Sequence, residues 1–387
     1  MTPILRVSVT FMAYYAATGA AWPYLPIYYH ELGLDLQAIG AVAALGSAVQ
    51  LLTAPAWGGL ADAFPRTRMT LPVAALVAAL GAVILAGAHD LATVLTATVV
   101  LSVGLAGVAP VLDARAMETL GPEQARYGQV RGLGSLAFVI VAWIVGVLID
   151  RNGVPILFVV YVPALIATAI VSAGLARNPT RRHVSIVSGG VAFVVAPGTR
   201  LFLFGLFLVW MSLTAANSFY SLRLAALGAP VQLVGLAWAI GSIVEVPLMW
   251  SYPRIAGRYG TTRPLVLGAA LFAVRAAVAA VATDPAVLLI AAPIEGMAFA
   301  LFVVGTVTYI AARAPSGMGS TAQGVSSAVG GLAAIAGSIV GGVVAQALTI
   351  QGLFAVCAVA SAVAAGVIAA AVREGAMPAP VAIAGFQ

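Results

Sequence analysis

Three charged residues lie inside long apolar runs of the sequence, namely Glu245, Arg275 and Glu295. A charge at the centre of a membrane span costs about 2.5–3.5 kcal/mol, so residues of this kind usually serve a function. At about 1.5 Å per residue, Arg275 and Glu295 lie about 12 and 14 Å from one end of their runs, and Glu245 lies a turn or two deeper. An acid and a base at matching depth can pair, and an acid can also carry a proton.

The charges do not balance. Arg275 can neutralise one of the two carboxylates, and the other is then left without a counter-charge in a medium of low dielectric constant. Binding a proton removes that cost. We therefore predict that Glu245 or Glu295 carries a proton, which is released when Arg275 approaches. The alternative is a purely structural ion pair between Arg275 and one carboxylate.

The composition defines the class of protein that surrounds these charges. The 387 residues are 62% hydrophobic and 8% charged, with a mean hydropathy of +1.08. Soluble domains carry about 25% charged residues, so a soluble enzyme, a nucleic-acid binder and a disordered chain are excluded. The single cysteine, Cys357, excludes a disulfide framework and a metal cluster, and we expect no cofactor.

Apolar runs of about 20 residues, the length that a bilayer requires, predict an all-α integral membrane protein with twelve spans. The runs cover 8–30, 37–60, 70–88, 91–116, 129–150, 154–176, 201–225, 231–254, 264–283, 286–312, 322–348 and 352–373. The one long break follows the sixth run. It predicts a first six-helix bundle over 1–176, a linker over 177–200, and a second bundle with a short tail over 201–387.

The arginines give the chain an orientation. Loops alternate between the two sides of the membrane, and basic residues gather on the cytoplasmic side. With twelve spans, fifteen of the eighteen arginines fall on the side of the N-terminus, two on the other side, and Arg275 within a span. We therefore expect a multi-pass protein of the cell (inner) membrane with both termini in the cytoplasm, and the basic balance is not a nucleic-acid footprint.

The sequence contains an internal repeat. At a shift of 195 residues, 31–50 (ELGLDLQAIGAVAALGSAVQ) and 226–245 (ALGAPVQLVGLAWAIGSIVE) share eight of twenty positions, including Gly40 with Gly235. The match places the second span on the eighth. Two parallel six-helix halves put a binding site at their interface, with access alternating between the two sides.

The loop after the second span reads Gly58-Gly59-Leu60-Ala61-Asp62-Ala63-Phe64-Pro65-Arg66-Thr67-Arg68. A glycine, an aspartate four residues later and then basic residues resemble the loop signature of the major facilitator superfamily. Pro65 and Ala63 depart from that signature. A carboxylate here can pair with arginines and helix ends of a neighbouring bundle, so we expect Asp62, Arg66 and Arg68 to act in gating.

Further segments resemble the phenylpropionate-permease, nucleoside-symporter and lactose-permease-like branch of that superfamily. They are 22–26 (WPYLP) in the first span, 110–113 (PVLD) in the fourth, 127–135 (YGQVRGLGS) in the fifth, 245–248 (EVPL) in the eighth and 322–324 (AQG) in the eleventh. The resemblance implies proton symport of small organic solutes. Where the branch often has Leu-His-Gly in span ten, this chain has Ile294-Glu295-Gly296.

Two further groups of residues complete the predicted site. Asp113 and Arg131 form a second pair near the cytoplasmic ends of spans four and five, with a gating or structural role. Aromatic and amide side chains suit a sugar, a nucleoside or an aromatic acid. The candidates that contact the solute are Tyr24, Gln50, Trp210, Asn217 and Tyr220.

The sequence therefore predicts a secondary transporter and not an enzyme, a monomer whose partners are a solute, protons and the lipid bilayer. Proton-driven antiport, with efflux of drugs or metabolites, remains open on the same fold. A polytopic membrane enzyme would need clustered histidines, but His30, His89 and His183 are far apart. ATP drive is excluded because the chain has no lysine to complete a phosphate-binding loop.

Overall fold

The computed structural model describes residues 2–63, 69–120, 127–175, 194, 198–314 and 319–374, and the elements in these ranges are all helices. Those before the predicted linker are α1 (Pro3–Ala21), α2 (Leu25–Glu31), α3 (Leu36–Ala63), α4 (Thr70–Ala86), α5 (Leu91–Leu120), α6 (Tyr127–Asn152), the short 3₁₀ helix η2 (Val154–Ile156) and α7 (Leu157–Ser172). Those after it are α9 (Thr199–Ala226), α10 (Gln232–Tyr259), α11 (Thr262–Val281), α12 (Pro285–Arg313) and α13 (Gly319–Glu374). The predicted all-α fold is confirmed.

Local sequence explains where several helices begin. Thr2 precedes Pro3 at the start of α1, and its hydroxyl accepts a hydrogen bond from the Leu5 N–H. Asp284 precedes Pro285 at the start of α12, and its carboxylate accepts from the Ala286 N–H at 2.7 Å. A capping oxygen followed by proline is a strong start signal, because proline has no N–H to leave unpaired.

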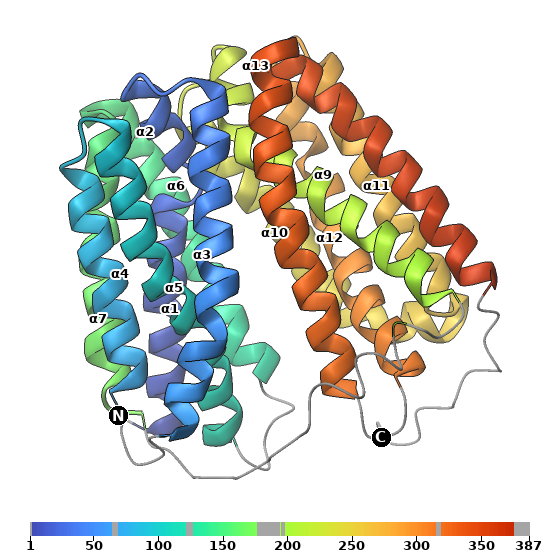
Figure 1. Ribbon diagram of the computed structural model, residues 1–387, viewed down its shortest axis with the longest axis horizontal. Coiled ribbons are helices and arrows are strands. Elements are labelled where there is room, and N and C mark those ends of the chain that lie inside the picture. The colour runs from blue at the N-terminus through green and yellow to red at the C-terminus, as the bar shows by residue number, and fades with distance from the viewer. Residues whose placement is uncertain are drawn as a thin grey trace.

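Within the described ranges, nine helices are long and apolar enough to span a membrane, and Thr70–Ala86 is a shorter apolar helix. One of the nine, Ala322–Arg373, has 52 residues, far more than the roughly 20 that a bilayer needs. It is not one rod, because Thr349 has a φ of 73° and the two arms of α13 fold back there (Figure 1). The predicted break between 348 and 352 lies at this point. The count of twelve spans stays a prediction.

The first predicted span, 8–30, is divided. Helix α1 ends at Ala21 and α2 begins at Leu25, with Pro23 between them and Pro26 in the first turn of α2. Proline removes an N–H and clashes with the preceding turn, which accounts for the interruption. The apolar run showed the length of the span but not the break within it.

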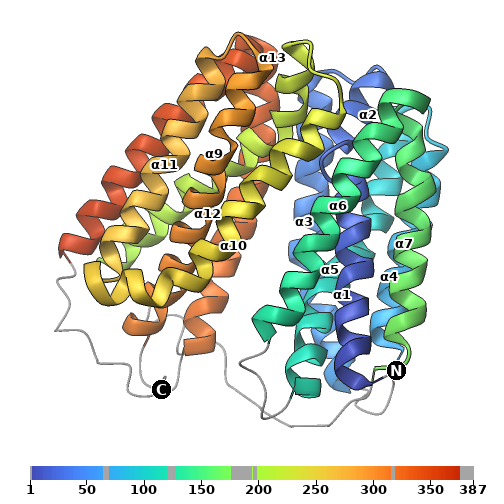
Figure 2. The same ribbon diagram turned by 180° about the vertical axis from the view of Figure 1, so that it is seen from behind.

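The helices gather into two halves that lie side by side, α1–α7 in one and α9–α13 in the other (Figures 1 and 2). Helix α3 contacts α13 and α6 contacts α10 across the boundary. The two halves meet at the end that holds α2 and the turn of α13, here called the closed end, and they separate toward the opposite, divergent end. Most of the predicted linker 177–200 lies outside the described residues, and the domain boundaries remain predictions.

The glycines of the internal repeat lie where the two halves meet. A Cβ added to Gly40 in α3 would come 2.5 Å from the carbonyl oxygen of Ser338 in α13. A Cβ added to Gly235 in α10 would come 2.6 Å from the carbonyl oxygen of Ala142 in α6. Only glycine permits backbones to approach this closely. The repeat therefore marks two equivalent contacts at the closed end.

Candidate functional site

A buried ion pair joins α11 to α12. The Nε of Arg275 lies 2.9 Å from Oε2 of Glu295, and the two residues are only 6% and 9% exposed. The Nη1 of Arg275 also donates to Oδ1 of Asn217 in α9 at 2.9 Å, and its guanidinium lies 4.7 Å from the ring centroid of Tyr220. A cation over an aromatic face adds to the attraction. Four residues that the sequence singled out, from three helices, thus form one cluster.

Glu245 lies beside this cluster, but the ion pair of Arg275 is made with Glu295. Helices α10 and α12 pack closely here, since a Cβ on Gly296 would come 3.0 Å from the backbone nitrogen of Glu245. Glu245 is partly exposed and lies within electrostatic range of both Glu295 and Arg131. The structure therefore places two acids near a single buried base.

A cavity of about 410 Å³ opens in the second half, between α9, α12 and α13. Among the described residues, its polar lining consists of hydroxyl and amide groups without a charged side chain, and Trp210 supplies an aromatic face. The Thr306 hydroxyl is buried and has no hydrogen-bond partner among the described residues. The lining residues are Trp210, Thr214, Val303, Thr306, Val307, Gln323, Ser326, Ser327, Gly330 and Ala334.

The cavity and the ion pair lie on the same faces of two helices. Thr214 lines the cavity and Asn217 follows it by three residues in α9, which is about one turn. Thr306 and Glu295 are eleven residues apart in α12, which is about three turns and 16 Å. A solute in the cavity and a proton at the acids would therefore share two helices.

A second, much smaller cavity of about 10 Å³ lies beside the ion pair, lined by Tyr220, Arg275, Ala279, Leu288, Ala291 and Ala292. This is room for about one water molecule. Within the described part of the chain, no three His, Cys, Asp or Glu side chains come together in a way that could hold a metal ion.

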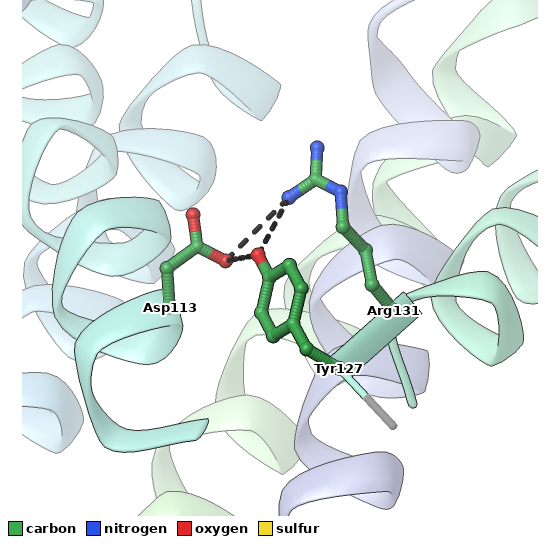
Figure 3. Close-up of polar contacts among 3 residues, drawn as sticks. All are labelled: Asp113, Tyr127 and Arg131. Atoms are coloured by element: carbon green, nitrogen blue, oxygen red, sulfur yellow. Dashed lines mark hydrogen bonds and ion pairs between the residues drawn. The ribbon is translucent and has the colours of Figure 1, made fainter. Parts of the chain in front are cut away.

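The first half carries a separate polar cluster of Asp113, Tyr127 and Arg131 (Figure 3). The Tyr127 hydroxyl donates to Oδ1 of Asp113 at 2.7 Å, and Nη1 of Arg131 lies 3.5 Å from both oxygens. The Arg131 guanidinium also lies 5.6 Å from the ring centroid of Tyr15. The predicted pair is thus present, but the side chains of Arg131 and Asp113 are 46% and 39% exposed. The net stabilisation by this ion pair is therefore small, about 0–1 kcal/mol.

The other predicted residues have different surroundings. Tyr24 is fully buried, and its hydroxyl donates to the backbone carbonyl of Ala142, away from the cavity lining. Gln50 is exposed on α3, next to Leu51, which packs against Gly331. The side chain of Asp62, and Arg66 and Arg68 entirely, lie outside the described residues.

Sequence reasoning missed the hydroxyls of the cavity, such as Thr306 and Ser326. A threonine in an apolar run commonly bonds to its own helix, as Thr308 does to the Val304 carbonyl at 2.8 Å. The sequence does not separate this arrangement from an unpartnered hydroxyl that faces a cavity, so it carried no usable signal.

Two helical halves side by side are typical of membrane transporters (Figure 1). The chain belongs to the MFS_1-like family, which matches residues 4–356, and so it is a major facilitator superfamily transporter. The resemblance predicted from the loop and span motifs is confirmed at this level.

Relatives and solved structures agree. The chain is 32% identical to the maltose permease of Geobacillus stearothermophilus over 321 residues, which cover 81% of this chain and 80% of the permease. It is 21% identical to the uncharacterized transporter YwbF of Bacillus subtilis (strain 168) over 318 residues, which cover 82% and 80%. The crystal structure of the nucleoside transporter NupG matches with a TM-score of 0.86 at 17% identity, covering 96% and 99%, and shows the shared fold.

Proposed function

We propose that this protein is a proton-coupled symporter that carries a small, neutral, polyhydroxylated solute of the sugar class into the cell. The observation that carries the proposal is the buried Arg275–Glu295 pair with a second acid, Glu245, close by and a cavity with hydroxyl groups in its lining that shares helix α12 with the pair. These features join a proton site to a solute site.

The proton coupling is supported by the balance of charge between two carboxylates and one buried arginine. Arg275 neutralises Glu295, and separating a buried pair by loss of one partner costs about 3–5 kcal/mol. Among the described residues, no cation lies as close to Glu245 as Arg275 lies to Glu295, so a bound proton would neutralise Glu245 at the lowest free-energy cost. A movement that shifts Arg275 toward Glu245 would release one proton and require the other carboxyl to take one up.

The helix register adds a second basic partner. Helices α6 and α10 are antiparallel, and Ala142 contacts Gly235 at the closed end. Glu245 lies ten residues after Gly235 in α10, and Arg131 lies eleven residues before Ala142 in α6. If the divergent end closed in the same register, Glu245 would meet Arg131. We propose that Arg131 exchanges Asp113 for Glu245 in that state, which makes closure sensitive to the proton on Glu245.

The solute class follows from the cavity. Hydroxyl and amide groups can both donate and accept, which suits a polyol, whereas an aromatic acid would call for a cation in the lining. Trp210 offers an apolar face to the C–H side of a sugar ring. The relative that is named a maltose permease supports this class over a nucleoside or an aromatic acid.

The distribution of arginines supports an orientation of the protein in the membrane. The arginines that gather on one side favour a cytoplasmic N-terminus, and α1 begins at the divergent end. We therefore propose that the closed end faces outward and that this conformation faces the cytoplasm, in a monomer of the cell membrane.

Uptake into proteoliposomes tests the proposal. An inward proton gradient should accumulate a radiolabelled sugar from a panel of sugars, nucleosides and aromatic acids. Glu245→Gln or Glu295→Gln should abolish accumulation but spare exchange of solute across the membrane, because exchange needs no net proton movement. Glu31→Gln is the matched control, since Glu31 is an exposed carboxylate in α2, at the closed end of the molecule.

Three results would contradict the proposal in different ways. Accumulation by both site variants would show that neither carboxyl couples the proton. Solute efflux driven by an inward proton gradient would show antiport instead. Gradient-driven uptake of a different class of solute would leave the coupling intact and refute the sugar assignment.

A further inference from the structure

Two side chains, Asp150 and Gln346, reach across the closed end, and each caps a helix of the other half. The carboxylate of Asp150, in the last turn of α6, accepts hydrogen bonds from the Val231 N–H at 2.7 Å and the Gln232 N–H at 3.0 Å, at the start of α10. The Oε1 of Gln346 in α13 accepts from the Leu36 N–H, at the start of α3, at 3.2 Å. The first N–H groups of a helix have no hydrogen-bond partner within it. Each half therefore supplies a side-chain acceptor to the first N–H groups of a helix in the other half.

The two caps are related by the internal repeat. A shift of 195 residues takes Leu36 to Val231, and a shift of 196 takes Asp150 to Gln346. The same shift of 195 relates the close contacts of Gly40 and Gly235. The two caps differ in charge, because Asp150 is an anion that the positive end of the α10 dipole favours, whereas Gln346 is neutral and accepts one bond.

The helices that receive these caps also differ. Helix α3 has a cap of its own, since Oδ1 of Asp35 accepts from the Ala38 N–H at 2.7 Å. The corresponding residue before α10 is Pro230, which has no side-chain oxygen, and Val231 makes no side-chain cap. In the described part of the chain, the side-chain cap of α10 therefore comes from the opposite half.

We propose that Asp150 is a latch for the closed end, because it gives α10 a cap that exists only while α6 and α10 are together. Opening this end removes the cap from α10, whereas α3 keeps Asp35 when Gln346 leaves. Asp150 thus favours the present conformation more strongly than Gln346 does. This effect acts on the conformational equilibrium itself, and it does not depend on the identity of the solute or on the coupling ion.

Electron spin distance measurements in lipid nanodiscs test the latch without solute or a proton gradient. In a Cys357→Ala background, one label pair at His89 and Gln351 reports the closed end, and a second pair at Leu5 and Tyr259 reports the divergent end. Asp150→Ala should raise about fivefold the population in which the two halves have separated at the closed end. This is the effect of losing one good helix cap. Gln346→Ala should have a smaller effect.

Asp90→Ala is the matched control. Asp90 makes the same kind of cap at the same end of the molecule, since its Oδ1 accepts from the Thr93 N–H at 2.7 Å, but both residues belong to the first half. Its loss should leave both distance distributions unchanged. Equal distributions for Asp150→Ala and Asp90→Ala would overturn the proposal.

A second variant separates a latch from a merely structural cap. Asp150→Ala leaves α10 uncapped and should lower the melting temperature. Adding Pro230→Asp gives α10 a cap of its own, as Asp35 does for α3, and should restore the melting temperature. It should not restore the closed population, because the new cap persists when the halves separate. Recovery of the closed population would show that Asp150 acts only on helix stability.

Discussion

Thr306 is the residue whose loss should separate stability from binding. Its buried hydroxyl has no partner among the described residues, an arrangement that costs about 1–3 kcal/mol in the empty protein. Thr306→Val keeps the shape and removes the hydroxyl, so it should raise the melting temperature of the empty transporter. If the solute normally satisfies this hydroxyl, its affinity should fall about two- to tenfold, the value of one hydrogen bond.

Thr308→Val is the control, because Thr308 lies on the same helix but bonds to the Val304 and Gly305 carbonyls and does not line the cavity. Solute-induced thermal stabilisation in detergent measures both effects. Equal losses of affinity in the two variants would remove Thr306 from the solute site.

At the scale of elements, the helices α3 and α13 carry two kinds of glycine. Gly40 in α3 faces α13 so closely that a Cβ would lie 2.5 Å from the Ser338 carbonyl oxygen, whereas no described atom lies within 4 Å of a Cβ on Gly366 in α13. Gly40→Val should therefore force α3 and α13 apart, shift the closed end toward the open state and reduce uptake at least tenfold. Gly366→Val should keep nearly normal uptake. The ratio of initial uptake rates, with surface expression measured in parallel, checks the difference, and similar losses at both positions would count against the helix contact.

At the scale of the whole molecule, alternating access requires the closed end to open once in each cycle. In a Cys357→Ala background, Leu36→Cys and Gln346→Cys place thiols on either side of the α3–α13 contact. A short, cleavable thiol cross-linker should stop uptake, and cleavage of the linker should restore it. The two single-cysteine variants, treated in the same way, should be unaffected. Continued uptake by the cross-linked protein would mean that the two halves need not separate at this end.

The sequence located much of the site because charge within an apolar run is conspicuous. It marked Arg275, Glu295, Asn217 and Tyr220 individually, and the structure brings these four together. It could not show which acid pairs with Arg275, because that depends on how three helices are rotated about their axes. Tyr24 illustrates the opposite case, since an aromatic residue near a predicted site is used instead in packing and in a hydrogen bond to Ala142.

By itself, the sequence determined that this is a helical membrane protein, because the bilayer demands about 20 apolar residues per span and that requirement is local. It also determined the breaks between most spans and the repeat that relates Gly40 to Gly235. Only the tertiary structure decided which helix ends are capped from the opposite half and which hydroxyls are left for a solute. Those properties depend on contacts between segments far apart in the chain, such as Asp150 with Val231, and no local pattern encodes them.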